Sequence, residues 1–190
     1  MRGVIRDLCA SIKNPQDYTA RTDPNVPIEE VAGVMAIQNR YSMMARWHEA
    51  LFPVLEELNI GFVAFSPMAN GLLTGAYNKD SRFDPKLDYR SNMPQFTAEA
   101  MDQNQDLFLL LNTLAQQKGA TPAQLSMAWM LCKKSWIVPI PGTRKLERLK
   151  ENAGAADVVL LPSEVSALDK ILDTIPMSQV FGGSKIVKKA

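Results

Sequence analysis

The chain has 190 residues, 46% of them hydrophobic, which is typical of one globular domain spanning residues 1–190. Its formal net charge of +1 at pH 7 indicates neither a nucleic-acid nor a membrane-surface partner. Two cysteines and one histidine are too few for a disulfide framework or a histidine-rich metal site. Because no apolar run is long enough to cross a bilayer and the N-terminus lacks a signal-peptide pattern, we expect a cytoplasmic protein.

The first 35 residues predict two short helices. Apolar residues at helical spacing favour one helix in RGVIRDLCASIK, residues 2–13. A second helix is expected in PIEEVAGVM, residues 27–35, because Pro27 suits a first helical position and acidic residues follow it. This helix runs into AIQNRYS, a predicted strand from residue 36, with no turn signal at the junction between Met35 and Ala36.

Residues 45–96 predict a helix, a strand and a long loop. Apolar spacing in ARWHEALFPVLEELNI, residues 45–60, indicates a helix that Pro53 kinks or restarts. The apolar run IGFVAFSP, residues 60–67, is typical of a parallel strand buried on both faces. Residues 68–96 are rich in turn residues and are predicted as a loop, and loops of this length are usually functional or disordered.

The remaining residues alternate helix, strand and helix. We expect helices over residues 97–119 and 121–134, the second with Thr121 as cap, Pro122 at the first position and Gln124 completing a capping box. A strand is expected in WIVPI, residues 136–140, and helices over residues 143–155 and 163–175. This alternation of strands and helices predicts an α/β fold with parallel strands.

The segment WIVPIPGTRKLERLKEN, residues 136–152, places cations where a helix normally disfavours them. A helix beginning near Thr143 would carry Arg144 and Lys145 at its positive end. Arg148 would follow one turn after Arg144, on the same face as Asn152. Unpaired backbone N–H groups at such a start attract anions, and a phosphate between two arginines would turn their repulsion into attraction.

The same pattern has a simpler interpretation. The basic residues can pair with Glu147 and Glu151 on a solvated helix face. Because the chain carries neither a glycine-rich dinucleotide fingerprint nor a P-loop, spacing alone does not decide between the two interpretations.

Three segments together resemble the aldo/keto reductase family. VPIPGTRKLERLKEN, residues 138–152, resembles its cofactor-phosphate segment; IGFVAFSPMANGLLTG, residues 60–75, resembles its seventh barrel strand and the following loop; and AIQNRYSMMAR, residues 36–46, resembles its sixth strand. The likeness runs from residue 36 to about residue 189, and residues 23–35 resemble a segment further upstream. The resemblance implies an α/β fold built as a (β/α)₈ TIM barrel, the cofactor NADP(H) and reduction of a small carbonyl compound.

The resemblance also implies roles for particular residues. Gln38 would bond the nicotinamide carboxamide, Phe65 would stack on the nicotinamide ring, and the following loop would cover the pyrophosphate. The 2′-phosphate would lie among residues 142–148, and the adenine next to them. The implied cofactor-binding positions are Gln38, Phe65, Ser66, Met68, Asn70, Gly71, Gly142, Thr143, Arg144, Arg148, Glu151 and Asn152. Without the resemblance, Phe65 would be read as a core residue and Gln38 as the partner of a backbone group.

No catalytic residue is predicted. The family uses an aspartate, a tyrosine, a lysine and a histidine from the first half of its barrel, and DYTARTDP, residues 17–24, holds no histidine at the matching place. Tyr18 matches a structural tyrosine rather than the proton donor, and His48 is expected on a helix surface.

The family's fifth strand is missing between residues 35 and 36, so we expect an incomplete barrel containing strands six to eight with their helices. Its open sheet edges predict self-association. Three functions remain open: an NADP-dependent reductase, an inactive NADP(H)-binding module or truncated remnant, and a chain that does not close into a binding fold.

Overall fold

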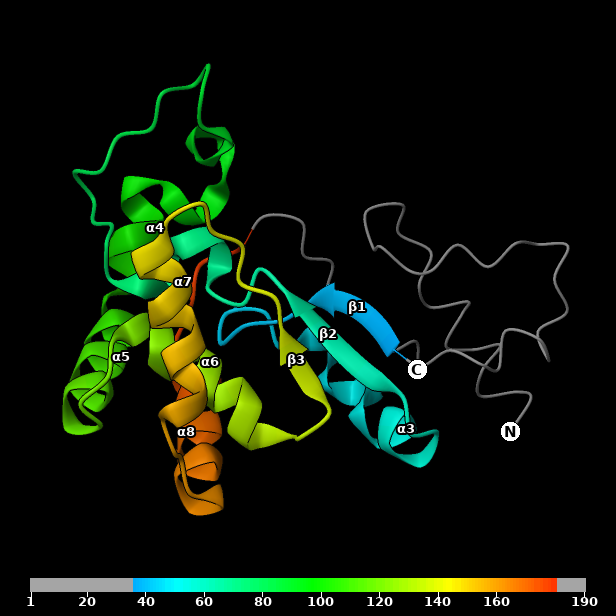
Figure 1. Ribbon diagram of the computed structural model, residues 1–190. Coiled ribbons are helices and arrows are strands. Elements are labelled where there is room, and N and C mark those ends of the chain that lie inside the picture. Colours follow the sequence, from blue (N-terminus) through cyan, green and yellow to red (C-terminus); the bar gives the residue numbers. More distant parts are fainter. Residues whose placement is uncertain (1–35, 181–190) are drawn as a thin grey trace, which may run out of the picture.

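The computed structural model describes residues 36–180, and its centre is a parallel sheet of three strands in the order β1-β2-β3 (Figure 1). The strands are β1 (Ala36–Arg40), β2 (Gly61–Phe65) and β3 (Ile137–Pro139). All three strand predictions and the parallel α/β arrangement are confirmed. The helices expected in residues 2–13 and 27–35, together with Tyr18, lie outside the described residues.

Two helical pieces connect β1 to β2. A 3₁₀ helix, η1 (Trp47–Leu51), leads directly into α3 (Phe52–Glu57). Pro53 stands in the first turn of α3, where its missing N–H costs no intrahelical bond, so the predicted restart at this proline is confirmed. The expectation that His48 lies on a helix surface is wrong, because η1 turns it inward and leaves it only 7% exposed.

The connection from β2 to β3 contains more structure than the sequence predicts. The segment expected as a loop forms three 3₁₀ helices, η2 (Ala69–Thr74), η3 (Tyr89–Asn92) and η4 (Pro94–Phe96). The single helix expected over residues 97–119 is divided into α4 (Ala98–Gln103) and α5 (Gln105–Gln117). The break falls at Asn104, which is fully buried and exchanges two side-chain hydrogen bonds with Ser178, at 2.8 and 2.9 Å.

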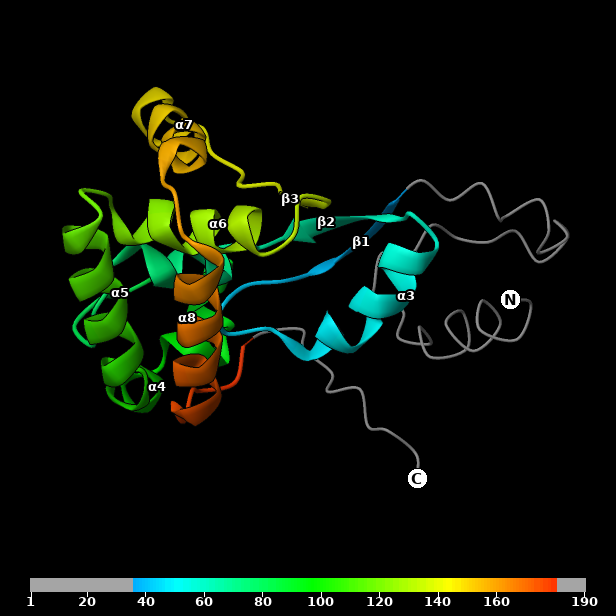
Figure 2. The same ribbon diagram turned by 90° about the horizontal axis from the view of Figure 1, so that it is seen from below.

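Helix α6 (Pro122–Lys133) has the predicted capping box, with Thr121 and Gln124 bonding each other's backbone N–H groups. After β3 the chain forms α7 (Leu146–Ala153), the short η5 (Gly154–Asp157) and α8 (Pro162–Thr174). Figures 1 and 2 show α5, α6, α7 and α8 grouped on one side of the sheet and α3 apart from them.

The core lies between the sheet and α6, which packs against β3, α5, α7 and α8. Trp129 of α6 is fully buried, and its ring stacks on Tyr41 with centroids 5.3 Å apart. Tyr41 also meets Phe52 and Phe62 edge to face. These aromatic contacts join α6 to the segment after β1 and to β2, so the helix and two strands form one packed unit.

The second face of the sheet is less covered than the sequence predicts. Along β2, Phe62 and Ala64 are fully buried, whereas Val63 and Phe65 on the opposite face are half-buried. Val63 pairs with Val138 of β3, which is 53% exposed. The expectation that this strand is buried on both faces is therefore wrong, because within residues 36–180 no further layer covers the Val63 face.

Candidate functional site

A cavity of about 470 Å³ lies at the carboxyl ends of the strands. In sheets of parallel strands, ligands bind at this edge because the loops that leave the strands converge there. Its lining comes from the strand ends, the loop after β2, the residues around η3, the segment after β3, and α7. The lining includes Arg40, Phe65, Ser66, Asn70, Gly71, Tyr77, Tyr89, Arg90, Gly142, Thr143, Arg148 and Asn152.

The loop after β2 has an unusual backbone where it borders the cavity. Ser66, Ala69 and Asn70 have φ values of 54°, 48° and 62°, in the left-handed region that side chains with a Cβ rarely adopt. Gly71 follows with φ 97°, and a Cβ on it would lie 3.2 Å from Tyr77 Cε2. Such conformations cost on the order of 1–3 kcal/mol each and cluster at ligand-binding loops. The loop therefore keeps a backbone conformation that shapes the cavity wall at a cost in stability.

Arg90 holds together the first part of the connection from β2 to β3, residues 68–96, where this segment borders the cavity. Its guanidinium contacts the rings of both Tyr77 and Phe83, with Cζ 4.8 and 4.6 Å from their centroids. It also donates to both carboxylate oxygens of Asp88 and to the hydroxyl of Tyr77. The hydrogen bonds from Arg90 lower the pKa of Asp88, so this ion pair persists at neutral pH. Arg90 is thus fully engaged within the loop.

Helix α7 begins later than the sequence predicts. Its first residue is Leu146 and its N-cap is Lys145, so Arg144 precedes the helix instead of standing in its first turn. The backbone N–H of Lys145 donates to Thr143 Oγ1 at 3.2 Å, which holds the chain in a turn before the helix. Arg148, in the first turn of α7, lines the cavity and donates to Glu151 Oε2 at 2.8 Å.

Nine of the twelve positions expected to bind a cofactor line this cavity. They come from two separate segments of the chain, residues 65–71 and 142–152, and are Phe65, Ser66, Met68, Asn70, Gly71, Gly142, Thr143, Arg148 and Asn152. The other three, Gln38, Arg144 and Glu151, are not among the lining residues. Gln38 lies on the same face of β1 as Arg40, two residues earlier, and Glu151 positions Arg148. Their binding roles stay predictions.

Among the lining residues that sequence reasoning missed, four have long polar or aromatic side chains: Arg40, Tyr77, Tyr89 and Arg90. One of them had a usable signal. Residues two apart in a strand share a face, so a predicted site position at Gln38 also predicts Arg40 on the site's side of the strand. The other three belong to the long connection, whose path over the cavity depends on aromatic contacts that sequence periodicity does not record.

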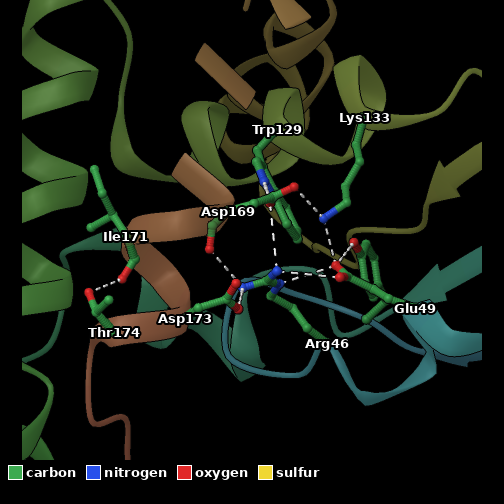
Figure 3. Close-up of polar contacts among 9 residues, drawn as sticks. Arg46, Glu49, Trp129, Lys133, Asp169, Ile171, Asp173 and Thr174 are labelled. Atoms are coloured by element: carbon green, nitrogen blue, oxygen red, sulfur yellow. Dashed lines mark hydrogen bonds and ion pairs between the residues drawn. The ribbon is translucent and has the colours of Figure 1, made fainter. Parts of the chain in front are cut away.

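A second polar cluster lies away from the cavity, where the segment after β1 meets α6 and α8 (Figure 3). Lys133 donates to Glu49 at 2.7 Å and to Asp169 at 2.9 Å, and Arg46 pairs with Glu49 and Asp173. The Tyr41 hydroxyl donates to Glu49 at 2.6 Å. Tyr41 is fully buried, and its burial raises its pKa, as does the Glu49 charge. These residues brace the fold and do not reach the cavity.

The cluster makes stability depend on pH. Burial raises the pKa of Glu49, but hydrogen bonds from Arg46, Lys133 and Tyr41 outweigh this and lower it overall. A folded pKa below the unfolded one, about 4.3 for glutamate, gives stability that is complete above pH 5 and lost as pH falls through the folded pKa.

We expect Glu49→Gln to lower the free energy of unfolding by about 1–2 kcal/mol at pH 7. The deficit should shrink below pH 4 in urea titrations, and a deficit of the same size at pH 3 and pH 7 would contradict this assignment.

Residues 36–180 contain no helix that is both long and apolar enough to cross a bilayer. In the same part of the chain, no group of three or more histidine, cysteine, aspartate or glutamate side chains is placed to hold a metal ion.

Comparison with known proteins identifies relatives of this arrangement. The family model described as "Aldo/keto reductase family" matches residues 18–173. Aldo-keto reductase str7 from Strobilurus tenacellus is 31% identical over 192 residues, which cover 82% of this chain and 57% of that protein. The glycerol dehydrogenase AKR11B4 from Gluconobacter oxydans has a similar structure, with a TM-score of 0.70, 25% identity and coverage of 82% of this chain and 47% of the other.

An aldo/keto reductase from Klebsiella pneumoniae, solved with NADP and acetate, is similar in fold, with a TM-score of 0.54 and 21% identity. The alignment covers 80% of this chain and 47% of that one. The chain therefore spans about half the length of the relatives it matches.

Proposed function

The chain belongs to the aldo/keto reductase family, and on that premise we propose that it carries the cofactor-binding half of an NADP(H)-dependent oxidoreductase that reduces a carbonyl compound. In this proposal β1, β2 and β3 correspond to strands six, seven and eight of an incomplete (β/α)₈ barrel. The observation that carries it is the convergence of nine expected cofactor positions on one cavity, from two segments about 70 residues apart in the chain, 65–71 and 142–152.

The residues present fit a nicotinamide dinucleotide. The Phe65 ring is half-buried at the cavity, as a stacking surface for a nicotinamide requires. No atom lies within 4 Å of the place where a Cβ on Gly142 would stand, so the wall there is open to a bulky group. Arg148 lines the same wall and supplies the charge that an extra phosphate needs, which favours NADPH over NADH.

Each part of the chain then has a task. The loop of Ser66, Met68, Asn70 and Gly71 covers the pyrophosphate, and Gln38 bonds the carboxamide. Gly142 and Thr143 approach the 2′-phosphate together with Arg148, Arg144 attracts it at longer range from outside the lining, and Glu151 and Asn152 lie by the adenine. NADPH supplies the hydride when bound.

A second candidate is a binding module without turnover. Within residues 36–180 the cavity lining contains no lysine, histidine, aspartate or glutamate. Tyr77 and Tyr89 line it, but the Tyr77 hydroxyl already accepts a hydrogen bond from Arg90. The lining formed by the described residues thus lacks the aspartate, lysine and histidine of the family's tetrad, which supports an inactive NADP(H)-binding module or a truncated remnant as the alternative.

We expect NADPH to bind the chain and to raise its melting temperature. A ligand at about 100 times its Kd stabilises a protein by about 2.7 kcal/mol, which corresponds to a shift of about 5–10 °C for a chain of this size. Isothermal titration calorimetry and a thermal melt with NADPH and with NADH measure this. Absence of both heat and shift with NADPH would refute the proposal.

A turnover assay separates the two candidates. NADPH oxidation at 340 nm is followed with simple aldehydes and ketones. Oxidation above background supports the reductase, whereas tight NADPH binding without oxidation supports the binding module.

A further inference from the structure

Arg40 is a buried cation on the wall of the cavity. The residue is 8% exposed and stands at the carboxyl end of β1, opposite Phe65 of β2 in the strand register. Its Nη1 donates to Ser66 Oγ at 2.8 Å and to Asn70 Oδ1 at 3.1 Å. Its Cζ lies 5.0 Å from the centroid of the Phe65 ring. Three contacts from the strained loop and the neighbouring strand therefore fix the guanidinium beside this ring.

The charge of Arg40 has no acidic partner among residues 36–180. Both of its acceptors are neutral, and the ion pairs formed in this part of the chain do not include it. The other two arginines of the cavity differ in this respect, because Arg90 pairs with Asp88 and Arg148 with Glu151. Burial lowers the pKa of Arg40, yet a guanidinium stays protonated at neutral pH.

We propose that Arg40 makes this cavity select its ligand by the charge of the group that lies at Phe65, so that a neutral reduced nicotinamide binds more tightly than the cationic oxidised ring. The proposal rests on the proposed function, in which Phe65 stacks on the nicotinamide. Its physical basis is Coulomb repulsion between two positive charges in a partly buried site, where the effective dielectric constant is about 20 rather than 80.

NADPH and NADP⁺ are a matched pair of probes for this effect. They share the adenosine, the pyrophosphate and the 2′-phosphate, and they differ in the nicotinamide ring, which is neutral in one and positively charged in the other. Any role of Arg40 toward the phosphates affects both nucleotides alike. The ratio Kd(NADP⁺)/Kd(NADPH) therefore isolates the contribution of charge at the ring.

Calorimetry on the full chain and on Arg40→Gln tests the proposal. We expect the unmodified chain to bind NADPH more tightly than NADP⁺, and we expect Arg40→Gln to reduce the ratio of the two Kd values about tenfold. Arg40→Lys keeps the positive charge while altering the planar contacts, so its ratio should stay close to that of the unmodified chain. Circular dichroism and a thermal melt establish that each variant is folded.

Other results decide against the proposal in distinct ways. Equal changes in both Kd values in Arg40→Gln would show that Arg40 acts on the shared phosphates or obstructs the ring without regard to charge. A ratio near one in the unmodified chain would overturn the proposal even if Arg40→Gln does not fold. If the unmodified chain binds neither nucleotide, the proposed function fails, and this inference fails with it.

Discussion

Replacing Arg148 by alanine is expected to weaken NADPH binding about 10–100-fold and to leave NADH binding nearly unchanged. Arg148 lines the cavity, and its partner Glu151 forms a half-exposed ion pair, which contributes little to stability. Its guanidinium is therefore available to a phosphate. A hydrogen bond to a charged group is worth about 1.5–3 kcal/mol, and each 1.4 kcal/mol is tenfold in affinity. Calorimetric titration of both nucleotides measures the two effects.

Arg144→Ala is the matched control. It removes the same side chain from a neighbouring position that precedes α7 and is not among the cavity-lining residues. We expect it to weaken NADPH binding no more than about threefold, through the loss of long-range attraction alone. If Arg144→Ala had the larger effect, the phosphate would lie outside the cavity. If both variants weakened NADH as much as NADPH, neither arginine would recognise the 2′-phosphate.

The choice between these two arginines shows where sequence reasoning ends. The pattern from Thr143 onward contains cations at helical spacing, and it favours a helix that includes Arg144. The true start at Leu146 depends on a turn in which Thr143 Oγ1 accepts the N–H of Lys145. Because residues 143–145 precede the helix, Arg144 does not share a helix face with Arg148, so the sequence named both arginines but did not show which of them lines the cavity.

Elements with strong local signals were predicted well. The apolar run of β2 is bounded by Gly61 and Pro67. The start of α6 is marked by Thr121, Pro122 and Gln124. Nearby residues are therefore enough to specify both elements. The break at Asn104 was not predictable, because its cause is a pair of hydrogen bonds with Ser178, 74 residues away. Local patterns contain no record of such contacts.

The burial of His48 and the role of Arg40 follow the same rule. His48 belongs to a segment with helical spacing, but the chain forms a 3₁₀ helix that turns the imidazole toward the Phe62 ring, with centroids 6.5 Å apart. The place of Arg40 in the cavity is evident only from its contacts with Phe65 and with the loop after β2. Both features depend on the register of β1 against β2, which a single strand sequence does not specify.

The second large effect is expected from Trp129→Ala, which should reduce the free energy of unfolding by about 3–5 kcal/mol. Trp129 is fully buried, its ring stacks on Tyr41, and its Nε1 donates to Asp169 Oδ1 at 2.9 Å. The substitution leaves a cavity at the junction of α6 with the segment after β1 and removes one donor from the polar cluster of Figure 3. A loss of this size is a large part of the stability of an ordinary domain. Urea denaturation followed by circular dichroism measures it.

Trp129→Phe separates packing from hydrogen bonding. Phenylalanine keeps an aromatic ring for Tyr41 but has no N–H for Asp169, so the cost should be smaller, about 1–2 kcal/mol. Asp169 retains its ion pair with Lys133 in this variant, which limits the penalty. If Trp129→Phe cost as much as Trp129→Ala, the hydrogen bond would dominate over packing. If neither variant changed the urea midpoint, the aromatic contact between α6 and the residues after β1 would not hold the sheet and helices together, and the cavity would lack the rigid support that nucleotide binding requires.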